Sequence, residues 1–342
     1  MSPKLQRRPH NRYNPVLIDK LKTSLYLALK SVKTLIGNTP VIHLKTANKH
    51  VRLFAKCEFL NPTASIKDRV AKYIIEKARK SGDLKPAQLI VEASSGNMGT
   101  SVAAVAREYG HPVHITCPEK TGKIKRRMIE TFGATLTVCR TTTDTQSGDF
   151  YVNRAKAIAA EKNGFLINQY DNLLNPECHY MTTGKEIVEY CIQHRLNLDY
   201  FIHVGGSGGT VSGCARRIKA HFPLAKVIMP DPVGSVYYDL KHQGAIIPDN
   251  VRSYCVEGPG NPVYCRSMDL NCIDTIIQFN DQDALDACDR LARNFGLLVG
   301  HSSGANFYIA QKLISQLQTS TDKTVNIMML LPDSGIKYLS AG

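Results

Sequence analysis

A lysine at the start of a predicted helix is the side chain best placed for covalent chemistry. Lys67 lies in the segment 61–69, Asn-Pro-Thr-Ala-Ser-Ile-Lys-Asp-Arg, where a turn leads directly into a helix. A lysine in such a position can be desolvated and kept partly neutral, as an amine that attacks a carbonyl carbon must be. The segment therefore predicts an imine-forming lysine, although a surface helix lysine would explain this residue taken alone.

Three further segments, each expected where a strand runs into a helix, combine glycines with polar side chains. They are 94–99 (Ser-Ser-Gly-Asn-Met-Gly), 205–210 (Gly-Gly-Ser-Gly-Gly-Thr) and 300–304 (Gly-His-Ser-Ser-Gly). Segment 205–210 predicts a phosphate site, because glycines allow close backbone approach and the following helix start favours an anion. It is neither a nucleotide-binding P-loop nor a dinucleotide fingerprint. A tight structural turn explains the glycines about equally well.

The composition is that of an ordinary globular protein. Of the 342 residues, 43% are hydrophobic and 21% are charged. No apolar run approaches the roughly 18 residues of a membrane span, and the basic N-terminus lacks the apolar core of a secretory signal. Ten cysteines without a Cys-x-x-Cys pair predict reduced, mostly buried thiols. We therefore expect a cytoplasmic protein with a frayed basic tail, no membrane partner and no metal site.

The formal net charge of +14 raises the question of nucleic-acid binding. The basic residues are dispersed, however, and no recognition motif accompanies them. The densest cluster, 120–127, also fits a solvated helix start. We expect no nucleic-acid partner, while a positive field would favour an anionic substrate or cofactor.

Short apolar runs alternate with amphipathic helices, which predicts α/β architecture with parallel sheets built from βαβ units. Strands are expected over 51–59, 89–92, 113–117, 135–139, 165–167, 200–204, 226–229 and 325–331. Helices are expected over 65–81, 97–109, 123–132, 179–194, 210–221, 283–294 and 305–316. Because ligands bind beyond the carboxyl ends of strands in open sheets, the four segments are expected to converge on one cleft.

Together the segments resemble the tryptophan-synthase-β-like family, the pyridoxal-phosphate enzymes of fold type II. Within it they are most similar to the branch of cystathionine β-synthase and cysteine synthase. The match rests on the frame around Lys67, on Ser-Gly-Asn-x-Gly at 95–99 and on Gly-x-Gly-Gly-Thr at 206–210. Further matching positions are Asn168, Gln169, Tyr170, Asn175, Pro176, His179, Thr182, Thr183, 231–235 and 332–334.

The resemblance implies two doubly wound open-sheet domains with the cofactor cleft between them. The smaller domain is expected over 47–154, and the larger one over 1–46 plus 155–342. Pyridoxal 5′-phosphate is the implied cofactor. Lys67 would hold it and later move the substrate α-proton.

The resemblance also implies how the other residues bind. Asn97 would hydrogen-bond the 3′-hydroxyl of the cofactor, and Ser302 would face its pyridine nitrogen, which makes the ring a weaker electron sink. Both residues could also cap helices, and Gln169 could be a simple loop contact. The phosphate would be held by Gly206, Ser207, Gly208, Gly209 and Thr210. The substrate carboxylate would be held by Ser94, Ser95, Gly96, Met98 and Gln169.

The implied reaction is β-replacement on serine or an O-activated serine through an α-aminoacrylate, with homocysteine as the expected nucleophile. Cysteine synthase with sulfide is the first alternative, and a synthase that uses glutamate is the second. Met98, His301 and the segment 259–262 depart from the pattern near the expected second-substrate region, so the nucleophile stays open. A homodimer is expected. A non-catalytic cofactor-binding protein is the alternative from another class, and the joint presence of the four segments argues against it.

Overall fold

The computed structural model describes residues 31–142, 144–317 and 324–339, which form two sheets. The expected basic tail lies outside these residues. In spatial order, the larger sheet contains β1 (Val41–Leu44), β2 (Val51–Cys57), β10 (Val325–Leu331), β7 (Tyr200–Ile202), β8 (Lys226–Pro232) and β9 (Thr275–Phe279). The smaller sheet contains β5 (Thr135–Cys139), β4 (Val113–Pro118), β3 (Ile90–Ala93) and β6 (Phe165–Leu166). All neighbouring strands are parallel except β1, which is antiparallel to β2.

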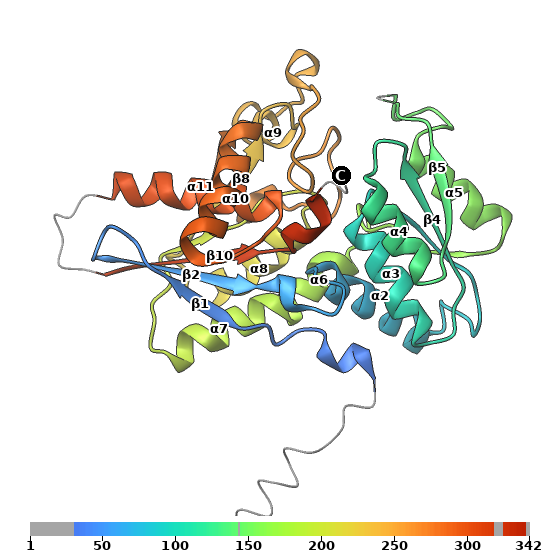
Figure 1. Ribbon diagram of the computed structural model, residues 1–342, viewed down its shortest axis with the longest axis horizontal. Helices are drawn as coiled ribbons and strands as arrows, with labels where there is room; N and C mark the ends of the chain where they lie inside the picture. Colours follow the sequence, from blue (N-terminus) through green and yellow to red (C-terminus); the bar gives the residue numbers. More distant parts are fainter. Residues whose placement is uncertain (1–30, 143, 318–323, 340–342) are drawn as a thin grey trace, which may run out of the picture.

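Helices cover both faces of each sheet, as parallel sheets require. In the larger unit they are α7 (Thr183–Gln193), α8 (Gly209–His221), α9 (Tyr237–Gln243), α10 (Asp281–Phe295) and α11 (His301–Gln316). In the smaller unit they are α2 (Lys67–Ser81), α3 (Asn97–Arg107), α4 (Lys123–Thr131) and α5 (Tyr151–Glu161). Figure 1 shows the two units side by side, with α6 (Leu174–Met181) between them; α6 packs against both α2 and α8.

The strand residues divide between the two faces with the expected alternation. On β10, Met328 and Leu330 join the core under α7 and α8, whereas Ile327 and Met329 join the core under α10 and α11. On β3, neighbouring residues again point to opposite cores, one under α2 and α3 and the other under α5. Each sheet is therefore buried on both faces, and ligands can reach it only at the ends of its strands.

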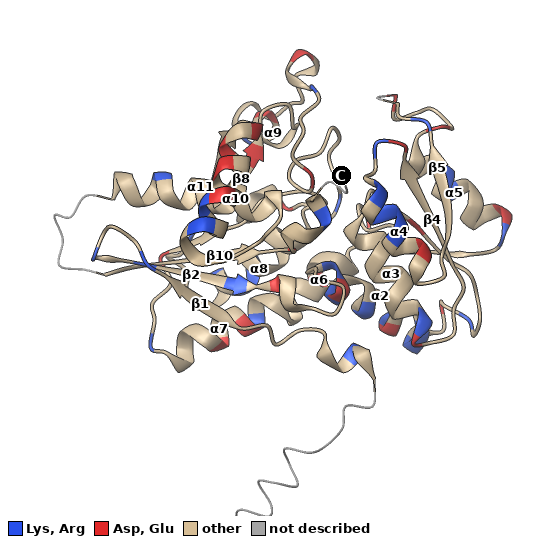
Figure 2. Cartoon of the chain, in the orientation of Figure 1, with Lys and Arg blue, Asp and Glu red and all other residues tan. Residues whose placement is uncertain are grey.

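Short 3₁₀ helices connect these elements. They are η1 (Val32–Leu35), η2 (Glu58–Leu60), η3 (Pro248–Asn250), η4 (Leu270–Cys272) and η5 (Gly335–Tyr338). One of them, η5, follows β10 of the larger sheet and contacts α4 of the smaller unit. Within the described ranges no helix has the length and apolar character needed to cross a membrane. Figure 2 shows the basic and acidic residues distributed along the chain in both units.

The expected α/β class with parallel sheets is confirmed, but several details differ. The smaller domain is expected over 47–154. β2 lies within that range but pairs with β10 in the larger sheet, and β6 lies beyond it but pairs with β3 in the smaller sheet. The polar stretch 140–149 lies between β5 and α5, inside the smaller unit. The helix expected over 179–194 is two helices, α6 and α7, which meet at Thr182.

Candidate active site

Four helix N-termini carry the expected site residues, and the chain that follows β10 connects three of them. Lys67, Asn97 and His301 are the first residues of α2, α3 and α11. The carbonyl of Pro332 accepts the backbone N–H of Ile66 at 2.9 Å, and the carbonyl of Asp333 accepts the N–H of Gly300 at 3.0 Å. The carboxylate of Asp333 accepts the Asn97 amide at 2.7 Å. The residues before Lys67 and Ser302 are thus tied to one segment, which also holds Asn97.

The glycine loop 205–210 joins this junction through a second loop. A Cβ atom on Gly206 would lie 2.3 Å from the carbonyl oxygen of Gly258, and one on Gly258 would lie 3.7 Å from Cβ of Ser302. The backbone N–H of Gly260 donates to the carbonyl of Gly205 at 2.5 Å. The four segments that the sequence singled out therefore meet in space.

Lys67 is half-buried, and its amine makes no hydrogen bond or ion pair with any other described residue. Burial lowers the pKa of this ammonium group, against the opposing influence of Glu92, Cys178, Cys265 and Asp333. The amine is therefore unpartnered and more easily neutral than an ordinary lysine, which suits a nucleophile.

The glycine loop presents a set of unoccupied donors. The backbone N–H groups of residues 206–210 donate to no other residue in the described part of the chain. Gly208 has φ of +88°, and a Cβ there would lie 2.5 Å from Cα of Met268. A Cβ on Gly209 would lie 2.1 Å from Oδ1 of Asn175. The glycines are therefore sterically required, and the free N–H groups at the start of α8 form an anion site.

Two residues of α6 support the glycine loop from behind. The amide of Asn175 donates to Ser207 Oγ at 3.1 Å and to the carbonyl of Gln169 at 2.9 Å. The ring of His179 contacts Thr210 Oγ1 at 3.1 Å through Nε2 and Thr183 Oγ1 at 3.0 Å through Nδ1. Burial lowers the pKa of His179 well below its ordinary value, so the ring is neutral and orients the Thr210 hydroxyl.

The loop before α3 is shaped by one serine and leaves another free. Ser94 Oγ accepts the N–H groups of Gly96 and Gly99 at 3.1 and 2.9 Å. The exposed hydroxyl of Ser95 and the N–H groups of Asn97 and Met98 have no partner among the described residues. These free groups lie at a helix N-terminus, where a carboxylate is favoured.

The side chains of Met98 and Gln169 are both buried but differ in where they point. Met98 is 2% exposed and packs in the core of the smaller unit, so only its backbone N–H is available to a ligand. Gln169 donates through Nε2 to the carbonyl of Ala93 at 3.2 Å, which places it beside the end of β3.

Ser302 lies in the first turn of α11, one turn earlier than the helix expected from the sequence. Ser302 is a buried residue beside Gly258, and its hydroxyl has no hydrogen-bond partner within the described ranges. The neighbouring His301 accepts the N–H of Glu257 at 3.2 Å through Nδ1, and its ring packs against that of Tyr338 in a tilted arrangement, with ring centroids 4.3 Å apart. Ser302 is therefore free to bind a ligand atom, whereas His301 is held by its neighbours.

Sequence reasoning gave no role to Glu92, a fully buried carboxylate on β3. Neither oxygen has a hydrogen-bond partner among the described residues. Burial raises the pKa of this group to about 8, opposed by the nearby amides of Gln169 and Asn168 and by Lys67. A charged residue within an apolar strand was the signal in the sequence.

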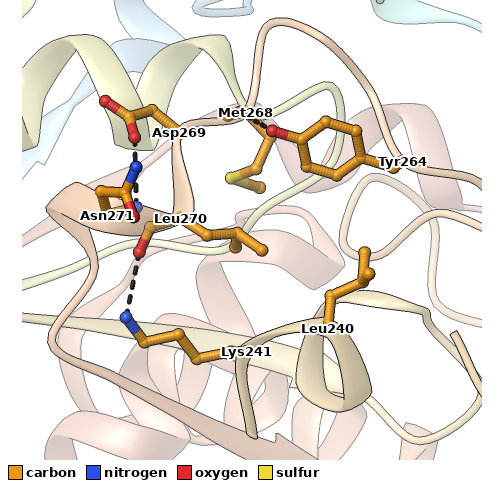
Figure 3. A pocket seen from close by; sticks show the side chains of 7 residues that line it. All are labelled: Leu240, Lys241, Tyr264, Met268, Asp269, Leu270 and Asn271. Atoms are coloured by element: carbon orange, nitrogen blue, oxygen red, sulfur yellow. Dashed lines mark hydrogen bonds between the residues drawn. The ribbon is translucent and has the colours of Figure 1, made fainter. Parts of the chain in front are cut away.

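A surface hollow of about 570 Å³ lies elsewhere, beside the chain that supports the glycine loop. In Figure 3, Lys241 donates to the carbonyl of Leu270 at 3.0 Å and Tyr264 to that of Met268 at 2.7 Å. Met268 also packs against Gly208. The hollow contains none of the expected site residues, so it is not the candidate active site.

Residues 32–331 match the family of pyridoxal-phosphate dependent enzymes. The chain belongs to this family. Cystathionine beta-synthase of Apis mellifera is 34% identical over 317 residues, which cover 91% of this chain and 61% of that protein. This chain therefore spans less than two thirds of that relative. Cysteine synthase of Staphylococcus aureus is 30% identical over 312 residues, which cover 91% of this chain and 95% of that protein.

Among solved structures, the O-acetylserine dependent cystathionine beta-synthase from Helicobacter pylori matches with a TM-score of 0.79 at 29% identity. The match covers 92% of this chain and 99% of that chain. The expected fold type II architecture and the expected cofactor, pyridoxal 5′-phosphate, are confirmed.

The residues at the junction fit this cofactor. Lys67 offers an unpartnered amine for its aldehyde, and Ser302 offers an unpartnered hydroxyl for its ring nitrogen. The unoccupied N–H groups of 206–210, held in a loop that admits no Cβ at Gly208 or Gly209, offer donors for its phosphate. Each polar part of the cofactor thus has a complementary group. None of the described residues forms a cluster suited to a metal ion.

Proposed function

We propose that this protein catalyses β-replacement on serine or an O-activated serine, with homocysteine as the nucleophile and cystathionine as the product. One observation supports the proposal above all. The amine of Lys67 is unpartnered and has a lowered pKa, and it lies at the same junction as free N–H donors suited to a phosphate and to a carboxylate. The names of the relatives, cystathionine beta-synthase and cysteine synthase, support the substrate class.

The bound cofactor would supply an electron sink that makes the α-proton of an amino acid acidic and allows the group on Cβ to leave. The N–H groups of 206–210 and the hydroxyl of Thr210 would hold its phosphate. Asn97 would donate to its 3′-oxygen, and Ser302 would contact its ring nitrogen. Lys67 would hold its aldehyde carbon covalently before the substrate binds.

The substrate would be oriented by its carboxylate. The N–H groups of Asn97 and Met98 and the hydroxyl of Ser95 would bind this carboxylate at the start of α3, where the helix dipole favours it. Ser94 would keep the loop in shape. The freed amine of Lys67 would then take the α-proton and later return it, a role that needs a neutral amine and is favoured by the lowered pKa.

Cysteine synthase with sulfide is the second candidate, because cysteine synthase of Staphylococcus aureus is 30% identical over 91% of this chain. A synthase that uses glutamate is the third candidate. The leaving group is equally open, and the Helicobacter pylori structure gives O-acetylserine as one choice to test.

The proposal includes a homodimer in a reducing compartment, the cytoplasm. All ten cysteines are unpaired, and Cys255 is the most exposed of them. This arrangement supports a compartment in which thiols stay reduced. Light scattering at several protein concentrations tests the dimer.

A substrate panel tests the reaction. The purified chain, loaded with pyridoxal phosphate, receives serine or O-acetylserine together with homocysteine, sulfide or glutamate. The highest kcat/KM is expected with homocysteine, and the Lys67→Ala variant is expected to lose at least about 10³-fold in kcat. A higher kcat/KM with sulfide or glutamate would move the assignment to that alternative, and no turnover with any pair would refute β-replacement.

A further inference from the structure

The side-chain amide of Asn97 is held at both ends by residues that follow β10. Its Oδ1 atom accepts the ammonium of Lys337 at 2.7 Å, and its Nδ2 atom donates to Asp333 Oδ2 at 2.7 Å. An amide nitrogen carries two hydrogens, and Asp333 accepts a hydrogen bond from one of them. One N–H group of Asn97 therefore remains free while the orientation of the amide is fixed from both sides.

Both partners of the Asn97 amide are buried residues. Lys337 is 6% exposed and Asp333 is 1% exposed. Burial lowers the pKa of Lys337, while Asp333 and Asp68 act in the opposite direction. The Asn97 oxygen is the only hydrogen-bond acceptor of this ammonium within the described ranges. Placing an ammonium in such a site is unfavourable for folding, so stability alone does not account for Lys337.

The same segment also fixes the neighbours of Asn97. Its backbone carbonyls bind the N–H groups of Ile66 and Gly300, the residues one and two positions before Lys67 and Ser302. A Cβ on Gly300 would lie 2.2 Å from Asp333 Oδ1, so the close approach depends on a glycine. The hydroxyl of Tyr338 donates to Asp333 Oδ2 at 2.7 Å and keeps that carboxylate in place.

We propose that Lys337 is a positioning residue that orients the Asn97 amide and strengthens its free N–H group as a donor to the 3′-oxygen of bound pyridoxal phosphate. The inference rests on the proposed function, in which Asn97 contacts that oxygen. A cation at the amide oxygen draws electron density from the nitrogen, so the remaining N–H becomes a better donor. The deprotonated 3′-oxygen is stabilised as a result.

The orientation follows from both charges together. Lys337 requires the oxygen of the Asn97 amide on its side, and the Asp333 carboxylate requires the nitrogen on its own side. Without Lys337 the amide loses one of these two constraints. A flipped amide would direct an acceptor, rather than a donor, at the 3′-oxygen.

The test compares Lys337→Met with Lys337→Arg in the cofactor-loaded protein, and Lys185→Met on the exposed face of α7 is the matched control. The Met variant is expected to move the absorbance of the bound cofactor from its long-wavelength band toward its short-wavelength band. It is also expected to weaken cofactor binding about tenfold, which corresponds to about 1.4 kcal/mol. The Arg variant should restore both readouts, and the control should change neither.

A second neutral variant keeps the test decisive if Lys337→Met folds poorly. Lys337→Gln retains an N–H donor without the charge, so we expect the same spectral shift with a smaller amplitude. An unchanged spectrum and an unchanged cofactor affinity in the neutral variants would overturn the inference, even if the cofactor-free protein melts at a lower temperature. Failure of wild-type protein to bind the cofactor through Lys67 would instead refute the proposed function.

Discussion

The ammonium of Lys125 lies 2.5 Å from the carboxylate of Glu257, and this ion pair joins α4 of the smaller unit to a loop of the larger one. The same ammonium lies 4.0 Å from the ring centroid of Tyr338. The Lys125 side chain is 4% exposed, so the pair is shielded from solvent on one side. The two units are therefore held together next to the residues that would bind the cofactor.

Removal of the Glu257 charge should loosen this junction. Glu257→Gln is expected to lower the free energy of unfolding by about 1–2 kcal/mol, because a buried ammonium loses its charged partner. Glu189→Gln, which breaks the exposed pair with Lys185, is the matched control and should change it by less than about 0.5 kcal/mol. Urea unfolding measures the free energy of unfolding of both variants. Equal losses would show that the interunit ion pair stabilises the protein no more than the exposed pair does.

Gly208→Ala should prevent cofactor binding. The added Cβ would lie 2.5 Å from the Met268 backbone at a φ of +88°, so the loop must change shape. We expect at least a tenfold loss of pyridoxal-phosphate affinity and a loss of about 1–3 kcal/mol in stability. Gly122→Ala is the control, since no atom lies within 4 Å of its added Cβ. Unchanged cofactor affinity in the Gly208 variant would contradict the assignment of the phosphate site.

Glu92 should make the stability of the cofactor-free protein depend on pH. Burial raises the pKa of this carboxyl from 4.5 to about 8, so the folded state binds a proton that the unfolded state releases. Its contribution is fully present below pH 4.5 and is lost as the pH rises to about 8. Glu92→Gln removes this titration, so the stability of the variant relative to wild type should increase between pH 5 and pH 8. Urea unfolding of both proteins at pH 5 and at pH 8 measures this change. A stability difference between variant and wild type that is the same at both pH values would contradict the prediction.

Met98→Thr should affect stability rather than substrate choice. The Met98 side chain is 2% exposed in the core of the smaller unit, and only its N–H group faces the expected carboxylate site. The replacement is expected to cost about 2–4 kcal/mol of stability through lost packing and a buried hydroxyl. The ratio of kcat/KM for homocysteine and sulfide should stay within about twofold. A large change in that ratio would show that the side chain selects the nucleophile.

Local patterns predicted most of the elements that position the site, because their hydrophobic periodicity agrees with their tertiary surroundings. The strands 135–139 and 325–331 and the helix starts at Asn97 and Lys123 were predicted at the residues where the structure has them. Residue types also identified the four segments that meet at the junction.

The pairing of strands that are far apart in the chain could not be predicted from local sequence patterns. Val51–Cys57 reads as a strand, but only its contact with β10, far along the chain, places it in the larger sheet. The contacts of Lys337 and Asp333 with Asn97 span 240 and 236 residues. The burial of Glu92 is likewise a property of the packed sheet, and no local pattern encodes such contacts.

Identifying the lysine that binds the cofactor tests the proposed role of Lys67. Protein loaded with pyridoxal phosphate is reduced with borohydride and digested, and the modified peptide is sequenced by mass spectrometry. We expect the added mass on Lys67 and no uptake by Lys67→Ala. Modification of another lysine, or of no lysine in cofactor-saturated wild type, would contradict this role.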